Sequence, residues 1–320
     1  MDLSLLIENL TNPALLFFFL GILAVQLKSD LEIPPNSSKF ISLYLMFSIG
    51  FKGGLELSHS PLDMGIFWAL VLGILLAIVV PVYSYFILRR KFNVADSGAI
   101  AAAYGSVSAV TFVTAVSFLE MKDIDFGGHM VAVMALMEAP SIIVGVLLMS
   151  YFRKEKTKKV DLWAVARHSM TNGSVLLIMG SLVIGFLASD QQARGIEPFT
   201  TDIFKGFLAV FLLDMGIASG KKLADFIKKG WFALSFAIVM PLINGCLVAL
   251  LSGWFIASTG DRFLFAILAA SASYIAVPAA MRLAAPKANP SLYLPMALAI
   301  TFPFNITLGM PIYLYLIQNL

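Results

Sequence analysis

Charged residues are scarce in this sequence. Asp, Glu, Lys and Arg make up 13% of the 320 residues, whereas soluble globular proteins carry about 25%. Hydrophobic residues make up 59%, and the mean hydropathy is +0.89. A soluble fold has too little interior to bury that much apolar surface, so a lipid bilayer must surround much of the chain.

Cysteine and histidine are also nearly absent. The single cysteine, Cys246, excludes a disulfide within the chain, and the three histidines are far apart in the sequence. We therefore expect no transition-metal site and no cofactor. The net charge of +3 comes from basic residues in short loops, which gives no indication of a nucleic-acid partner. No nucleotide-binding loop or hydrolase motif is visible, so we expect neither an enzyme nor an ATP-driven pump.

Long apolar runs fill most of the chain. A helix needs about 20 apolar residues to cross the hydrocarbon core of a bilayer. Ten runs approach that length, which predicts an all-α polytopic membrane protein. They cover residues 12–28, 38–57, 64–88, 97–119, 129–152, 172–189, 202–220, 231–256, 262–284 and 291–317.

Lys and Arg are distributed unevenly between alternate loops. Cytoplasmic loops are enriched in these residues, so the richer side is predicted to be cytoplasmic, with both termini outside and the protein in the inner (plasma) membrane. The poorer side receives only Lys52, Lys122, Arg194, Lys205 and Arg262. The richer side receives Lys28, Lys39, Arg89, Arg90, Lys91, Arg153, Lys154, Lys156, Lys158, Lys159, Arg167, Lys221, Lys222, Lys228, Lys229, Arg282 and Lys287.

The two halves of the chain resemble each other at an offset of about 160–166 residues. Gly50-x-x-x-Gly54 in the second run corresponds to Gly216-x-x-x-Gly220 in the seventh, and Pro140 corresponds to Pro303. Five spans per half is an odd number, so the second half must start from the opposite side. The sequence thus predicts two inverted repeats, 1–152 and 172–320, joined by a basic cytoplasmic linker at 153–171.

The fourth and ninth runs are rich in Ala, Ser and Gly. Gly105 and Pro278 weaken a helix, so we expect spans 4 and 9 to be broken at the midplane. The freed backbone groups and hydroxyls would bind a substrate between the two breaks. The alternative is that these are small helix-packing residues whose hydroxyls bond to nearby carbonyls. The candidate substrate-binding residues are Gly105, Ser106, Ser108, Ala109, Thr111, Ser271, Ala272, Ser273 and Tyr274.

Acidic residues within the apolar runs are candidates for a cation site. Glu138 lies in the fifth run and Asp214 in the seventh. Charge at membrane depth is costly and usually functional. Thr301 and Asn305 add polar oxygens in the last run. Either acid could bind Na⁺ or carry a proton, or it could make a structural hydrogen bond to a neighbouring helix.

These segments resemble the cyanobacterial type of sodium-dependent bicarbonate transporter over nearly the whole chain. The shared segments are Ile49–Gly54, Gly105–Thr111, Met137–Pro140, Ser271–Tyr274 and, most specifically, Lys287–Tyr293 with its Ala-Asn-Pro-Ser-x-Tyr turn. The resemblance implies ten spans in inverted halves, Na⁺-coupled bicarbonate uptake and a trimer. It also implies that the anion is held between the middles of the fourth and ninth spans.

The chain departs from the family pattern at several positions. It has Ala109 and Val110 where the family has Gly and Ser, Tyr274 where the family has Asp, and Glu138 where the family has Asp. The family's loop between the halves is long and serves a PII-like regulator. That loop is short here, so we do not extend this partner to the chain.

The sequence thus favours a secondary transporter that moves a small anion such as bicarbonate with Na⁺. Two other functions remain open. One is a cation–proton exchanger or organic-anion symporter of the same architecture, and the other is a membrane sensor that binds a ligand without transporting it.

Overall fold

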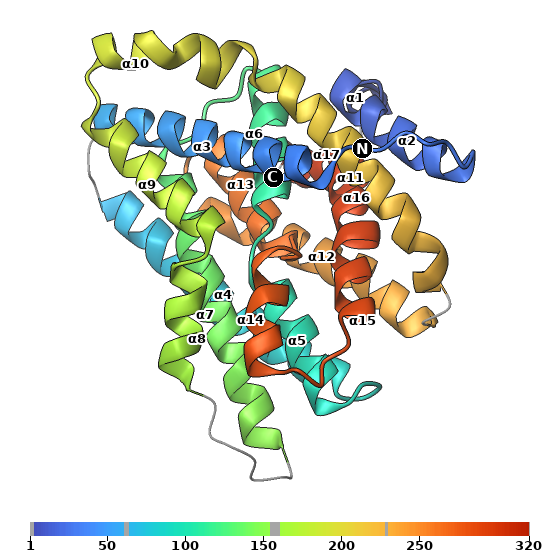
Figure 1. The fold of residues 1–320 in the computed structure, drawn as a ribbon. Coiled ribbons are helices and arrows are strands. Elements are labelled where there is room, and N and C mark those ends of the chain that lie inside the picture. The colour runs from blue at the N-terminus through green and yellow to red at the C-terminus, as the bar shows by residue number, and fades with distance from the viewer. Residues whose placement is uncertain (1–2, 61–63, 154–160, 228–229, 320) are drawn as a thin grey trace.

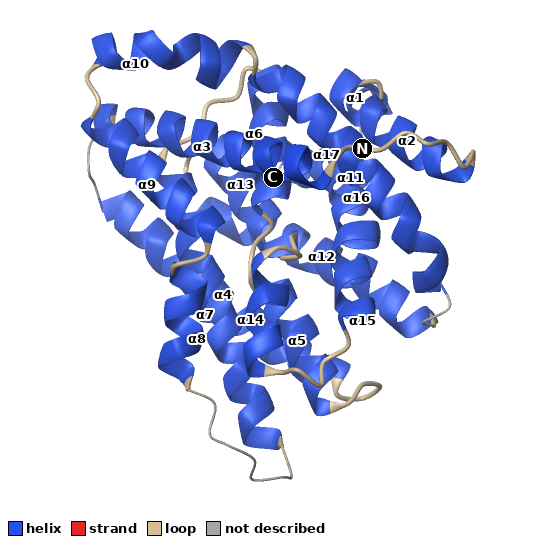
Figure 2. Cartoon of the chain, viewed as in Figure 1, coloured by secondary structure: helices blue, strands red, loops and turns tan. Residues whose placement is uncertain are grey.

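The computed structural model describes residues 3–60, 64–153, 161–227 and 230–319, and within these ranges the chain is helical with no strand (Figure 2). This confirms the all-α class. The first half contains α1 (Leu3–Leu10), α2 (Pro13–Gln26), α3 (Pro35–His59), α4 (Met64–Leu88), α5 (Val94–Gly105), α6 (Ala109–Met121) and α7 (His129–Phe152).

The first helix after α7 lies inside the predicted linker, and the next one follows directly after the linker. The chain after α7 contains α8 (Leu162–Met170), α9 (Gly173–Leu187), α10 (Asp190–Glu197), the π-turn η1 (Pro198–Asp202), α11 (Phe204–Ile227), α12 (Trp231–Leu251), the 3₁₀ turn η2 (Ser252–Trp254), α13 (Thr259–Ala270) and α14 (Ala276–Ala284). The last helical stretch is continuous but changes pitch, as α15 (Pro290–Pro295), η3 (Met296–Thr301), α16 (Phe302–Phe304), η4 (Asn305–Gly309) and α17 (Met310–Asn319), where η3 and η4 are π-helical.

Within the described residues, seven helices are long and apolar enough to cross a membrane, or eight if the bent pair α8–α9 is counted as one span. The predicted ten are therefore not all matched. The predicted first span is only the 14 residues of α2, which rise about 21 Å. The predicted ninth span is the pair of short helices α13 and α14.

The predicted linker 153–171 contains a helix that the sequence analysis did not anticipate. Asp161 caps α8 by accepting the backbone N–H groups of Trp163 and Ala164 at 3.0 and 3.1 Å, and such caps start helices. A bend of 54° separates α8 from α9. Asn172 then caps α9, because its side-chain oxygen accepts the Ser174 N–H at 3.0 Å. Residues 154–160 of the linker lie outside the described residues.

Two pairs of helices pack closely together, α2 on α11 and α3 on α9 (Figure 1). Glycines allow the backbones to approach closely. A Cβ on Gly21 of α2 would overlap the carbonyl oxygen of Leu213 in α11, and a Cβ on Gly185 of α9 would overlap that of Phe51 in α3. Small residues serve this purpose in membrane helix pairs, where close van der Waals contact replaces the hydrophobic effect.

The remaining helices form two further groups, α4 with α5 and α7, and α12 with α13 and α17. The four half-helices α5, α6, α13 and α14 join these groups, because α13 contacts both α5 and α6, and α14 contacts α5. Almost all side chains of α5 and α13 are buried, including Tyr104, Phe263 and Phe265. Apolar residues on α2, α4, α9 and α12, such as Leu16, Trp68 and Leu187, are instead exposed, as expected of a lipid-facing surface.

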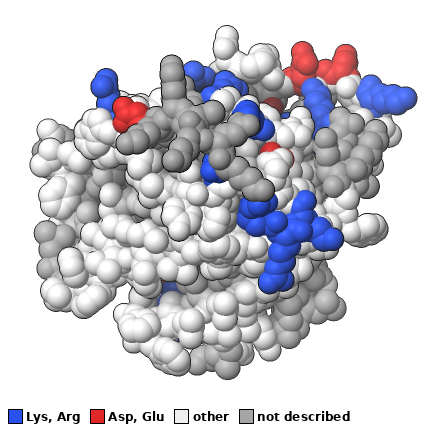
Figure 3. Space-filling view, turned by 90° about the horizontal axis from the view of Figure 1, so that it is seen from below, with Lys and Arg blue, Asp and Glu red and all other residues white. Residues whose placement is uncertain are grey.

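Basic residues gather on one end of the molecule. Figure 3 shows this end from below, and Lys and Arg cover more of it than Asp and Glu do. Exposed members include Arg89, Arg90 and Lys91 after α4, Arg167 on α8 and Lys287 before α15. The end of α6 and helix α10 lie at the top of Figure 1, away from these loops.

Candidate functional site

The first helix break lies between α5 and α6, at residues 106–108. Gly105 ends α5 at a point where a Cβ would overlap the Pro81 ring and the Ser141 hydroxyl, so only glycine fits. Ser108 then caps α6, because its Oγ accepts the N–H of Thr111 at 3.2 Å. The interruption predicted around Gly105 is confirmed.

The second break separates α13 from α14, at residues 271–275. Pro278 was predicted to cause it, but the helix has already ended at Ala270 when Pro278 is reached. Pro278 lies in the first turn of α14, where its missing N–H costs little. The chain is interrupted instead in the Ser-Ala-Ser segment, whose first residue, Ser271, bonds through Oγ to the Leu268 carbonyl at 3.0 Å.

Neighbouring helices supply donors to carbonyls at the ends of α5 and α13, next to the breaks. The Ala102 carbonyl accepts the Ser141 hydroxyl of α7 at 2.9 Å. The Ala269 carbonyl accepts the Asn244 amide of α12 at 3.1 Å, and the Ala270 carbonyl accepts the Asn305 amide of η4 at 2.8 Å. A buried carbonyl without a partner is costly, so these side chains make the breaks tolerable at depth.

The two breaks are bonded directly to each other. The Ser273 N–H donates to the Ala103 carbonyl at 2.8 Å, and the Ser108 N–H donates to the Ser271 hydroxyl at 3.1 Å. Residues 163 or more positions apart therefore meet, as the comparison of the two halves predicted. The hydroxyl of Ser106 is also buried here, and no described residue bonds to it.

A small pocket of about 20 Å³ lies where the breaks meet. Ser108 and Ala109 line it from the first break, Ser273 and Tyr274 from the second, and Glu138 from α7. Its other lining residues are Met46, Val107, Ser174, Ile178 and Ile275. That volume holds about one water molecule.

Glu138 is the one acidic residue in this lining. No hydrogen bond or ion pair joins its carboxyl group to another described residue. An ionised carboxylate without a partner is costly in an apolar surrounding, so a cation or a proton is needed here. The half-helix N-termini of α6 and α14 flank the same pocket, and their free N–H groups favour an anion.

A comparison with family models gives one match, the Na⁺-dependent bicarbonate transporter superfamily, over residues 13–318. The match spans nearly the whole chain, including both breaks and Glu138. This chain belongs to that superfamily. The resemblance drawn from the sequence is thereby confirmed, and the chain is placed in a family of membrane transporters. A search for similar curated proteins finds no match.

The remaining predicted residues of this superfamily member lie around the pocket rather than in its lining. Gly105, Ser106, Thr111, Ser271 and Ala272 belong to the breaks but are not among the residues that line the pocket. They are buried, and most of them hold the breaks in shape.

The three other candidates for a cation site are engaged elsewhere. Asp214 on α11 accepts the Ser38 hydroxyl of α3. Thr301 donates to the Ala237 carbonyl at 2.7 Å and contacts the Tyr104 hydroxyl at 2.7 Å. Asn305 supports Ala270, as described above. Of the four candidates, Glu138 alone lines the pocket between the breaks.

Sequence reasoning missed the supporting residues Ser141 and Asn244. Both are buried polar residues in otherwise apolar helices, a signal that was available in the sequence. Asn244 also accepts the Tyr83 hydroxyl of α4 at 2.5 Å, so it joins the two halves. The sequence could not predict which carbonyl accepts a hydrogen bond from each of these side chains, because the carbonyls belong to other helices.

The Ala-Asn-Pro-Ser-x-Tyr turn, the most specific part of the resemblance, has a structural role. The Asn289 side chain caps α15 by accepting the Ser291 N–H at 3.0 Å. The Asn289 N–H donates to the Asp96 carboxylate, in the first turn of α5, at 2.7 Å. The turn thereby ties the start of the last helical stretch to the start of the first broken helix.

Proposed function

We propose that this protein is a secondary transporter that takes up a small anion, with bicarbonate as the first candidate, coupled to Na⁺. One observation carries the proposal. Two helix breaks meet at a pocket that combines two half-helix N-termini with the unpartnered carboxyl group of Glu138. Dipole ends suit an anion and a carboxylate suits a cation, so one site serves both ions.

The proposal includes ten spans in two inverted repeats, 1–152 and 172–320. The glycine contacts support it. In this proposal α2 corresponds to α9, and α3 corresponds to α11. Gly21 of α2 faces a carbonyl of α11, and Gly185 of α9 faces a carbonyl of α3. The two glycines therefore hold equivalent places in the two repeats. The α4–α5–α7 and α12–α13–α17 groups correspond in the same way. With the basic end cytoplasmic, both termini face outward from the plasma membrane. The trimer stays a prediction of the resemblance.

The pocket must enlarge for a substrate to bind. About 20 Å³ is too little for a polyatomic anion, since one water molecule needs nearly as much. Tyr274 occupies the position where the family has an acid. Its ring lies 6.2 Å from that of Phe302, edge to face. We infer that Tyr274 must move away before bicarbonate binds.

Uptake of labelled bicarbonate into proteoliposomes, with and without an inward Na⁺ gradient, tests the proposal. We expect uptake that requires Na⁺, and Glu138→Gln should need a much higher Na⁺ concentration to support the same uptake. Na⁺-dependent uptake of a different anion would keep the mechanism and replace the substrate. No Na⁺-dependent uptake of any small anion would refute the proposal.

A cation–proton exchanger is the second candidate, and the unpartnered carboxyl group of Glu138 favours it, because a carboxyl group in an apolar site can carry a proton. An exchanger would acidify or alkalinise vesicles in response to a Na⁺ gradient without any added anion. Loss of that signal in Asp214→Asn would assign the proton to Asp214 on α11, and loss in Glu138→Gln would assign it to the pocket.

A further inference from the structure

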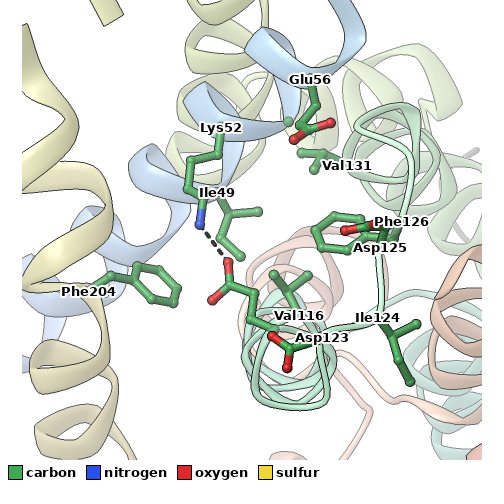
Figure 4. Close-up of a pocket in the computed structure, with 12 residues that line it drawn as sticks. Ile49, Lys52, Glu56, Val116, Asp123, Ile124, Asp125, Phe126, Val131 and Phe204 are labelled. Carbon is green, nitrogen blue, oxygen red and sulfur yellow. Dashed lines mark hydrogen bonds and ion pairs between the residues drawn. The ribbon is translucent and has the colours of Figure 1, made fainter. Parts of the chain in front are cut away.

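A second cavity, of about 330 Å³, lies between α3 and the outer end of α6 (Figure 4). Its apolar wall includes Ile49, Val116 and Phe204, and the carboxylates of Glu56, Asp123 and Asp125 lie at its edge. An ion pair crosses it. The Lys52 ammonium of α3 lies 2.5 Å from the Glu120 carboxylate of α6.

This cavity and the pocket between the breaks are stacked along the same two helices. On α3, Lys52, Ile49 and Met46 follow one another at intervals of three residues, so each lies beside the next with a turn of about 60° around the helix at each step. Lys52 and Ile49 line the cavity, while Met46 lines the pocket. The step from Ile49 to Met46 is about 4.5 Å along the helix axis.

Helix α6 repeats this arrangement. Glu120 and Val116 line the cavity and are one turn apart, and Ala109, two turns further along, lines the pocket. Ile49 and Val116 are 4% and 2% exposed. They therefore form a floor about one turn below the ion pair, between the cavity and the pocket, and on α6 two further turns separate this floor from Ala109.

The two sides of the cavity belong to differently packed parts of the fold. Helix α3 is held to α9 through Gly54 and Gly185. Helix α6 is held to α13 by the stacked rings of Phe118 and Phe263, whose centroids are 5.6 Å apart. Between α3 and the four half-helices, Lys52–Glu120 is the only hydrogen bond or ion pair that the described residues make.

We propose that Lys52 and Glu120 form a latch that keeps the outer end of the transport path closed. The inference rests on the proposed function, because it takes the break pocket to be the transport site. Opening the floor requires α3 and α6 to separate, and this separates the ammonium from the carboxylate. Both side chains are partly exposed, 31% and 25%, so the pair is weak enough to break in each cycle.

The test measures how often the floor opens. Val116→Cys, placed in a Cys246→Ser background, reports opening because Val116 is 2% exposed in the closed state. The rate of maleimide labelling is measured in nanodiscs, where both faces of the membrane are accessible. We expect Lys52→Gln and Glu120→Gln each to raise this rate about fivefold, as expected for a weak ion pair, and the exchanged pair Lys52→Glu/Glu120→Lys to restore it to within about twofold.

Lys122→Gln is the matched control. Lys122 is two residues beyond Glu120 and forms an ion pair with Glu8 of α1, which does not cross the cavity. It should leave the labelling rate unchanged. Three results would overturn the latch. The labelling rate could stay unchanged in both Lys52→Gln and Glu120→Gln, or Lys122→Gln could raise it as much as they do. The exchanged pair could also label as fast as the single variants. The labelling needs no substrate, so a missing Na⁺-dependent uptake refutes the proposed function and leaves this result standing.

Discussion

The amide of Asn305 gives the sharpest test of how the second break is held. Asn305 is completely buried and was predicted to be a cation ligand, but its Nδ2 donates to the Ala270 carbonyl at 2.8 Å. No other described group donates to that carbonyl. Its Oδ1 accepts the Tyr313 hydroxyl at 3.2 Å, and that hydroxyl also reaches the Pro241 carbonyl.

Asn305→Ala should therefore leave one buried carbonyl unpaired, while Tyr313 keeps a partner. An unpaired buried group costs about 1–3 kcal/mol, and we expect about 2 kcal/mol here. Ser141→Ala is the matched control. The Ala102 carbonyl loses the Ser141 hydroxyl but keeps the Ser106 N–H at 3.0 Å, so we expect at most about 1 kcal/mol. The apparent melting temperature in detergent should fall in the order wild type, Ser141→Ala, Asn305→Ala.

The variant Asn305→Asp distinguishes two roles of Asn305, donating a hydrogen bond to the Ala270 carbonyl and binding a cation. The carboxylate keeps the size of the amide but cannot donate to the Ala270 carbonyl, so this variant should be less stable than Asn305→Ala and should not be rescued by Na⁺. A cation ligand would behave in the opposite way, because a carboxylate binds Na⁺ at least as well as an amide oxygen. Stabilisation of Asn305→Asp by Na⁺, or an Asn305→Ala variant as stable as Ser141→Ala, would refute the structural role.

Two further predictions concern the pocket. Glu138→Gln should raise the half-saturating Na⁺ concentration for uptake at least about tenfold, since it removes the one carboxylate that lines the site. Asp214→Asn should change the half-saturating Na⁺ concentration less, because Asp214 already accepts the Ser38 hydroxyl. A larger effect of Asp214→Asn than of Glu138→Gln would place the cation at Asp214. Tyr274→Ala should lower the KM for bicarbonate and admit larger monocarboxylates, because it removes a bulky ring that lines the pocket. An unchanged size limit in transport competition would show that other side chains set it.

The first break, and the run that contains the second, could be predicted from the sequence because helix interruption at depth has a local signature. Gly105 and the Ser271–Ser273 segment stand out in apolar runs. What compensates the breaks could not be predicted, since Ser141 and Asn305 lie 39 and 35 residues from the carbonyls they support. The number of spans was also uncertain for a physical reason, because α2, α13 and α14 are each shorter than the helix that a full crossing normally needs.

Charge partners were likewise beyond the reach of the sequence. Lys52 is a charge within the second apolar run, but the sequence does not indicate which acid is its partner. Glu120 was overlooked because it comes at the end of a run, next to Lys122. The pairing depends on the α3 and α6 faces turning toward each other, which is a property of helix packing and not of either segment.

The helix contacts favour a different register for the proposed inverted repeats. The sequence pairs Gly50 with Gly216, whereas the helix contacts make Gly54 the equivalent of Gly216, one turn away. A Cβ on Gly54 would overlap the Leu182 carbonyl, and one on Gly216 would overlap the Phe18 carbonyl. Gly54→Val and Gly216→Val should therefore lower the yield of folded protein about equally, as measured by fluorescence size-exclusion chromatography. Gly180→Val, which meets no atom within 4 Å, is the control and should fold normally. A tolerated Gly216→Val beside a disruptive Gly54→Val would show that the two crossings are not equivalent and would count against inverted repeats.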